Sequence, residues 1–174
     1  MDTNTNSSGI QAGQRIFFRA LGTTYKVLSS SVHGGAAIVE HTVEPGCIGA
    51  PMHKHTHEDE ISYVLEGRLS AIQDGTVETA EPGQYLVKPR GKFHTFWNAE
   101  NKRVRFVEVI TPGNFESYFA EIAPYLAEGK APQIDKLREV AAKYSLITDP
   151  VATEEIIKRF GLKQMGVSAG VHIL

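Results

Sequence analysis

The chain has 174 residues, of which 41% are hydrophobic and 22% are charged, as in an ordinary globular domain. Its net charge of -2 gives no electrostatic reason to expect nucleic acid or an anionic membrane surface as a partner. The single cysteine, Cys47, excludes an intramolecular disulfide framework, and residues 1–9 lack the apolar segment of a signal peptide. We therefore expect one cytoplasmic domain without nucleic-acid or membrane partners.

Short apolar segments separated by turn signals follow one another through the first two thirds of the chain. Residues 1–13 are rich in Asn, Ser, Thr and Gly and are expected to form a mobile tail. Asp74-Gly75 predicts a tight hairpin. The segments after the tail predict an antiparallel sandwich or barrel over residues 14–111. The expected strands are residues 25–28, 36–43, 61–65, 68–72, 85–87, 94–97 and 103–110.

The spacing of apolar residues becomes helical from Asn114 onward. A second helix is expected over residues 132–144. A third is expected over residues 150–160, with Asp149 as its N-cap and Gly161 after its end. We expect residues 112–174 to form a helical extension packed on the outside of the barrel. The first helix is indicated by apolar residues three and four positions apart: Phe115, Tyr118, Phe119, Ile122 and Leu126.

Histidines alternate in the segment 51–60, where His53, His55 and His57 precede Glu60. Alternate side chains of a strand point to the same face, and a turn after the histidines would bring Glu60 beside the first two. Converging imidazole and carboxylate groups are ligands of first-row transition metals. The alternative is a solvated loop rich in His and Glu. For His57 itself, three roles are open: a partner of a ligand, a substitute ligand, or an exposed residue at the rim.

A second motif lies in the segment 83–98, which fits G-x5-P-x-G-x2-H-x3-N at each fixed position and includes His94. The earlier segment fits H-x-H-x4-E-x6-G, ending at Gly67. Together the two motifs resemble those of the cupin superfamily, and the resemblance covers residues 46–98 directly. One departure is Cys47, which stands where the family pattern has a glycine; that glycine serves a turn rather than a ligand.

The resemblance implies a mainly β fold, a cupin jelly-roll antiparallel β-barrel of about six to eight strands. It also implies a metal inside the barrel, bound by His53, His55, Glu60 and His94. We expect these four side chains to come from separate strands. The ion would be one divalent transition metal: Fe, Mn, Ni, Co, Cu or Zn. Four protein ligands would leave one or two positions for water, O2 or substrate.

Residues 111–119 narrow the resemblance to single-domain cupins related to flavonol (quercetin) 2,3-dioxygenases. This implies cleavage of a flavonol-like or other enolisable aromatic substrate by O2. Glu60 would then be the catalytic base as well as a ligand. The alternatives are a non-catalytic cupin that binds a small molecule and a cupin isomerase. Candidate apolar walls of the substrate site, only about half of which can face inward, are Phe93, Phe96, Trp97, Phe106 and Tyr85.

The segment 15–28 precedes the barrel and would leave an exposed strand edge if it were unpaired. We therefore expect this segment to pair with a second chain, which would make the protein a homodimer.

Overall fold

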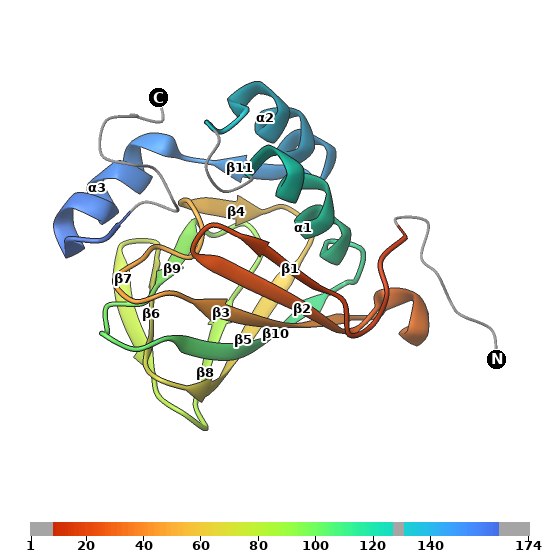
Figure 1. The fold of residues 1–174 in the computed structure, drawn as a ribbon, viewed down its shortest axis with the longest axis horizontal. Coiled ribbons are helices and arrows are strands. Elements are labelled where there is room, and N and C mark those ends of the chain that lie inside the picture. Colours follow the sequence, from red (N-terminus) through yellow and green to blue (C-terminus); the bar gives the residue numbers. More distant parts are fainter. Residues whose placement is uncertain (1–8, 127–130, 164–174) are drawn as a thin grey trace.

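The computed structural model describes residues 9–126 and 131–163. Figure 1 shows two β-sheets with the helices gathered at one end of them. The pairs of neighbouring strands are antiparallel. In sheet order, the six-stranded sheet contains β1 (Arg15–Phe18), β2 (Leu21–Val27), β3 (Ala37–Val43), β10 (Val104–Thr111), β5 (Asp59–Glu66) and β8 (Tyr85–Lys88). The five-stranded sheet contains β11 (Leu146–Thr148), β4 (His53–His55), β9 (His94–Trp97), β6 (Leu69–Gln73) and β7 (Thr76–Ala80).

The mainly β jelly-roll architecture predicted from the sequence is confirmed. Strands β3 to β10 account for the eight strands at the upper end of the expected number, and β1, β2 and β11 extend the two sheets. A short 3-10 helix, η1 (Ser29–Val32), joins β2 to β3. Of the expected N-terminal tail, residues 1–8 lie outside the described residues, as do residues 164–174 of the helical extension.

Strict alternation along the central strands decides which side chains reach the interior. Every second residue of β10 is buried, and the same holds for most of β5. This alternation turns the apolar side chains inward because successive side chains of a strand point to opposite faces. The same alternation also points some polar side chains into the core. The polar residues that it buries on these two strands are Glu60, Ser62 and Glu108.

The hairpin predicted at Asp74-Gly75 is confirmed. Asp74 has a φ of 44° and Gly75 a φ of 84°. A two-residue turn that matches the twist of its strands needs positive φ at both central positions. The turn sets the register of β6 against β7, in which Gln73 faces Thr76.

The N-terminal strands pair within the chain. Strand β1 pairs with β2, and β2 pairs with β3. The expected pairing of residues 15–28 with a second chain is therefore wrong for β2, both of whose edges are taken. Within the described part of the chain, β1 has β2 as its one neighbour. The homodimer itself stays a prediction.

The helices predicted after the sheets are present: α1 (Glu116–Ile122), continued by the 3-10 helix η2 (Ala123–Leu126), α2 (Ile134–Lys143) and α3 (Pro150–Phe160). Asp149 caps α3 by accepting a hydrogen bond of 2.9 Å from the backbone N–H of Ala152. Strand β11 was not predicted; it pairs with β4, where Leu146 faces His55. Figure 1 shows α1, α2 and α3 lying around this added strand, beside β4. Over the ranges that the structure describes, none of the helices combines the length and apolarity needed to span a membrane.

Candidate metal centre

Four buried side chains converge inside the jelly roll. They are His53 and His55 from β4, Glu60 from β5 and His94 from β9. One ligand atom from each lies within 4.8 Å of the others. Ligand atoms that each lie ~2.1 Å from a metal are separated from one another by ~3 to ~4 Å. The cluster is therefore close to the size of a metal site and needs only a small contraction to become one.

The sheet topology brings these residues together. His53 faces His94 in the pairing of β4 with β9. Glu60 faces Ile110 on β10 and Lys88 on β8, so it projects from the opposite sheet. The expectation that the four side chains come from separate strands is wrong, because His53 and His55 share β4.

Each imidazole of the cluster has an oxygen atom beside its Nδ1. His53 Nδ1 lies 2.7 Å from the carbonyl oxygen of Pro51, and His94 Nδ1 lies 3.1 Å from that of Lys92. His55 Nδ1 lies 3.4 Å from a carboxylate oxygen of Glu58. A carbonyl oxygen can only accept, so the proton of the His53 and His94 rings belongs on Nδ1. The Nε2 atoms are then left as lone-pair donors, in the tautomer that a metal ligand needs.

The Nε2 atoms of His55 and His94 are fully buried, and within the described residues neither has a hydrogen-bond partner. The oxygens of Glu60 lie 3.3 Å from the first and 3.4 Å from the second. Buried polar atoms without a partner are rare, and a bound ion is one explanation for them. The donor set of three imidazoles and one carboxylate fits a divalent transition metal.

Electrostatic interactions within the cluster shift the pKa values of its members. Burial alone would raise the pKa of Glu60, but the charges of Lys88 and His55 hold it well below its ordinary value. Burial lowers the pKa of His55, yet the carboxylates of Glu60 and Glu58 outweigh it and raise that pKa to about 9. The pKa of His53 is well below its ordinary value because of burial and the two neighbouring imidazoles. A bound ion would have to displace the proton of His55.

Sequence analysis missed two charged residues behind the cluster. Lys88 is 1% exposed, and its Nζ donates to Glu60 at 2.9 Å and to Glu108 at 2.7 Å. Ser62 Oγ donates to Glu108 at 3.0 Å. The alternation of side chains along a strand could have indicated them. Lys88 follows buried Leu86 by two positions, and Glu108 lies two positions from both buried Phe106 and buried Ile110.

His57 is exposed and is not a member of the cluster. Of its three open roles, the structure supports the exposed residue at the rim. The side chain beside His55 is instead Glu58, which is 8% exposed.

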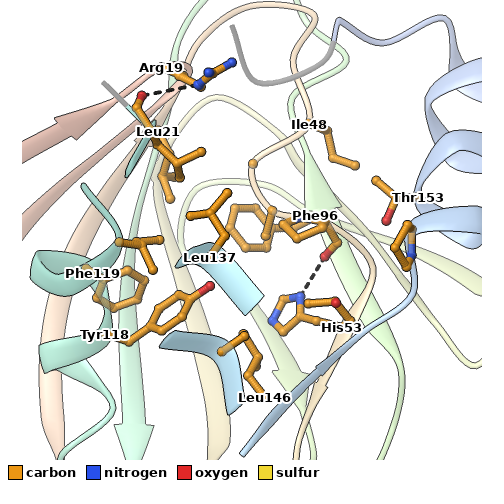
Figure 2. Close-up of a pocket in the computed structure, with 18 of the residues that line it drawn as sticks. Arg19, Leu21, Ile48, His53, Phe96, Tyr118, Phe119, Leu137, Leu146 and Thr153 are labelled. Atoms are coloured by element: carbon orange, nitrogen blue, oxygen red, sulfur yellow. Dashed lines mark hydrogen bonds between the residues drawn. The ribbon is translucent and has the colours of Figure 1, made fainter. Parts of the chain in front are cut away.

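The cluster opens into a cavity of about 220 Å³ that reaches from His53 and Glu60 to the C-terminal helices. Figure 2 shows Tyr118, Leu137 and Leu146 around the position of His53. Most of the wall is apolar. Apolar side chains that line it are Leu21, Ile48, Phe96, Phe115, Phe119, Ile122, Ile134, Leu137, Leu146 and Ile157.

The predicted aromatic walls are only partly present. Phe96 lines the cavity, whereas Tyr85 is 63% exposed on the outside of the molecule. Trp97 packs against Phe160 on the other face of β9, with ring centroids 4.6 Å apart. Phe106 is buried in the core. The other aromatic walls come from α1 and the residue before it, whose aromatic side chains were not among the walls predicted from the sequence.

Comparison with known proteins places these features in a family. The family model described as Cupin domain matches residues 39–110. The chain is 31% identical to quercetin 2,3-dioxygenase of Bacillus subtilis over 74 residues, which is 42% of this chain and 22% of that protein. It is 39% identical to oxidoreductase iacF of Pestalotiopsis fici over 56 residues, 32% of this chain and 28% of that protein. The matches thus span less than a third of the length of either relative.

The fold has a counterpart among solved structures. The crystal structure of a predicted oxalate decarboxylase from Thermotoga maritima superposes with a TM-score of 0.52 at 24% identity. The superposition covers 62% of this chain and 97% of that one. At this identity the likeness concerns the fold alone. The family match and the two motifs show that this chain carries a cupin domain over residues 39–110.

Proposed function

We propose that the protein is a metal-dependent dioxygenase that cleaves a flavonol-like or other enolisable aromatic substrate with O2. The observation that carries the proposal is the position of the His53, His55, Glu60 and His94 cluster at the end of an apolar cavity. The local similarity to a quercetin 2,3-dioxygenase supports it, over the part of that protein that matches.

The donor set suits an ion that keeps open positions. Three neutral imidazoles and one carboxylate fill four places, and a first-row divalent ion accommodates one or two further ligands. When bound, the ion would act as a Lewis acid toward a substrate hydroxyl and supply the redox chemistry that O2 requires. The protein residues would hold the ion, orient the substrate and keep water out.

The cavity wall favours a flat apolar substrate with one polar end. Phe96, Phe119 and Leu137 offer apolar surface, and His53, Glu60 and Glu108 supply polar groups at the cluster. Further polar residues of the wall are Arg19, Arg138, Thr153 and Glu154. Binding sites for small molecules commonly combine apolar walls with a few placed polar groups. A sugar, which carries hydroxyl groups on all sides, would leave many of them facing apolar side chains, at a cost in free energy.

The role of Glu60 as the catalytic base is part of the same proposal and is the less supported part. One of its carboxylate oxygens already accepts from Lys88 at 2.9 Å. Its pKa is held well below the ordinary value, although burial alone would raise it, by the charges of Lys88 and His55. A carboxylate with a low pKa is a weak base. Glu60 is thus better placed to hold an ion than to take a proton.

The test is to load the protein in turn with Fe, Mn, Co, Ni and Cu ions and to follow flavonol bleaching together with O2 consumption. Zinc, which has no redox chemistry, is the control ion. The proposal predicts coupled bleaching and O2 uptake with at least one of the redox ions and neither with zinc. Binding of the flavonol without O2 uptake for any ion would leave a small-molecule-binding cupin. An isomerase would convert its substrate without O2.

A further inference from the structure

A second carboxylate, Glu108, lines the cavity beside the candidate metal centre but is not one of its four residues. It projects inward from β10 and is 1% exposed. Lys88 and Ser62 donate hydrogen bonds to its carboxylate. A buried carboxyl in a binding cavity that holds no ion itself is a candidate for proton transfer.

Lys88 lies between two carboxylates that are held ionised to different degrees. Its ammonium group lies 2.9 Å from Glu60 and 2.7 Å from Glu108. Glu60 is held in its ionised form by two positive groups, Lys88 and protonated His55, whereas Lys88 is the charged partner of Glu108. Burying a net charge is unfavourable, and a carboxyl group can avoid it by taking up a proton. Of the two carboxylates, Glu108 is therefore the one that takes up a proton more readily.

We propose that Glu108 is a catalytic residue that takes the proton which a hydroxyl or enolisable substrate loses when it binds. This inference rests on the proposed function. The substrate O–H bond breaks, its electron pair stays on the substrate oxygen, and the proton moves to a carboxylate oxygen of Glu108. Glu108 becomes a neutral acid, while Lys88 keeps Glu60 as its counter-charge. The buried negative charge moves from Glu108 to the substrate oxygen, so the net charge within the cavity does not change.

The surroundings of Glu108 are consistent with this role. Burial raises its pKa to about 7, more than the charge of Lys88 lowers it, and the charge of Glu60 adds to the rise. Ser62 donates to it and favours the ionised form. On the adjoining strand β3, His41 also lines the cavity, and burial lowers its pKa to about 4, so it is neutral near pH 7. A base with a pKa near the working pH is the most effective kind.

The first test uses the metal-free protein without a ligand. Infrared difference spectra across neutral pH should show a carboxyl band that titrates with a midpoint near 7. Glu108→Gln should abolish the band, whereas Glu66→Gln, which removes an exposed carboxylate on β5, should leave it. Ser62→Ala keeps Glu108 but removes a donor to its ionised form, so the midpoint should move to higher pH. A band that persists in Glu108→Gln, or no titrating band in the wild type, would overturn the proposal.

The second test counts protons during binding. Quercetin, and acetylacetone as a second probe, are titrated by calorimetry without O2 into zinc-loaded protein, about one pH unit above the infrared midpoint. Repeating the titration in buffers of different ionisation enthalpy gives the number of protons released. The wild type and Glu66→Gln should release few, because Glu108 keeps the proton. Glu108→Gln should release about one more per bound probe.

The outcomes separate the two proposals. If a probe binds and the wild type and Glu108→Gln release equal numbers of protons, Glu108 is not the acceptor and the dioxygenase proposal stands. If neither probe binds, the proposed substrate class is wrong, and the proton transfer falls with it. If Glu108→Gln does not fold, the Ser62→Ala arm decides: wild type and Ser62→Ala with the same infrared midpoint would overturn the assignment.

Discussion

His53 and His94 face each other as paired residues of β4 and β9, with ring centroids 4.4 Å apart. The two histidines come from different motifs, so the pairing of these short strands is what joins the motifs into one site. Strand β4 has β11 on its other side, where Leu146 faces His55. The C-terminal segment therefore supports the strand that carries two of the four candidate ligands.

Replacing His94 should remove most of the metal. We expect His94→Ala to weaken binding by more than the ~10- to ~100-fold that loss of an outer partner causes, because it removes one of the four groups that would hold the ion directly. The matched control is His57→Ala, which removes an exposed histidine of the same region. Metal content per chain is measured by elemental analysis after dialysis. Equal metal content in wild type and His94→Ala would show that the ion binds elsewhere.

A larger side chain in the cavity should prevent flavonol binding and leave metal binding unchanged. Leu137 of α2 lines the cavity at a distance in sequence from all four cluster residues. Leu137→Trp should therefore abolish flavonol binding while metal content stays at the wild-type value. Val151→Trp on α3, where the side chain is 70% exposed and does not line the cavity, is the control. Undiminished flavonol binding in Leu137→Trp would place the substrate elsewhere.

The metal-site motifs could be located from the sequence because spacing alone defines them. Alternation predicted that His53 and His55 share a face, and the second motif identified His94. Of the aromatic walls, Phe96 was predicted, but those from α1 were not, because they depend on how α1 packs over the cavity. The pairing of β11 with β4 was missed because Leu146–Thr148 is too short to stand out as a strand.

Acid should destabilise the protein through His41. This buried histidine lies beside Thr23, and burial lowers its pKa from 6.5 to about 4. Between these two pH values the unfolded chain binds the proton and the folded protein does not. The contribution of His41 to the free energy of unfolding is therefore fully present above pH 6.5 and is lost as the pH drops toward 4. The loss should be about 3 kcal/mol. Urea unfolding of the wild type and His41→Gln across this range measures it. Equal pH dependence in both proteins would contradict the assignment.

The homodimer is predicted to form through β1. This strand has one neighbour within the described residues, and Phe17 on it is 59% exposed. A free edge with an exposed apolar side chain invites pairing with a second copy, and a lysine discourages it. Light scattering at micromolar concentration should give a dimer for the wild type and a larger monomer fraction for Phe17→Lys. A wild-type monomer would rule the dimer out.

The central claim is that His53, His55, Glu60 and His94 hold one ion at the end of the substrate cavity. The most direct measurement is a crystal structure of the metal-loaded protein, grown with quercetin in the absence of O2, with the ion located by its anomalous scattering. The account predicts one ion per chain, bound by the three Nε2 atoms and Glu60, with a substrate hydroxyl oxygen directed at it and the rings between Phe96 and Leu137. An ion bound by other residues, or quercetin outside this cavity, would contradict it.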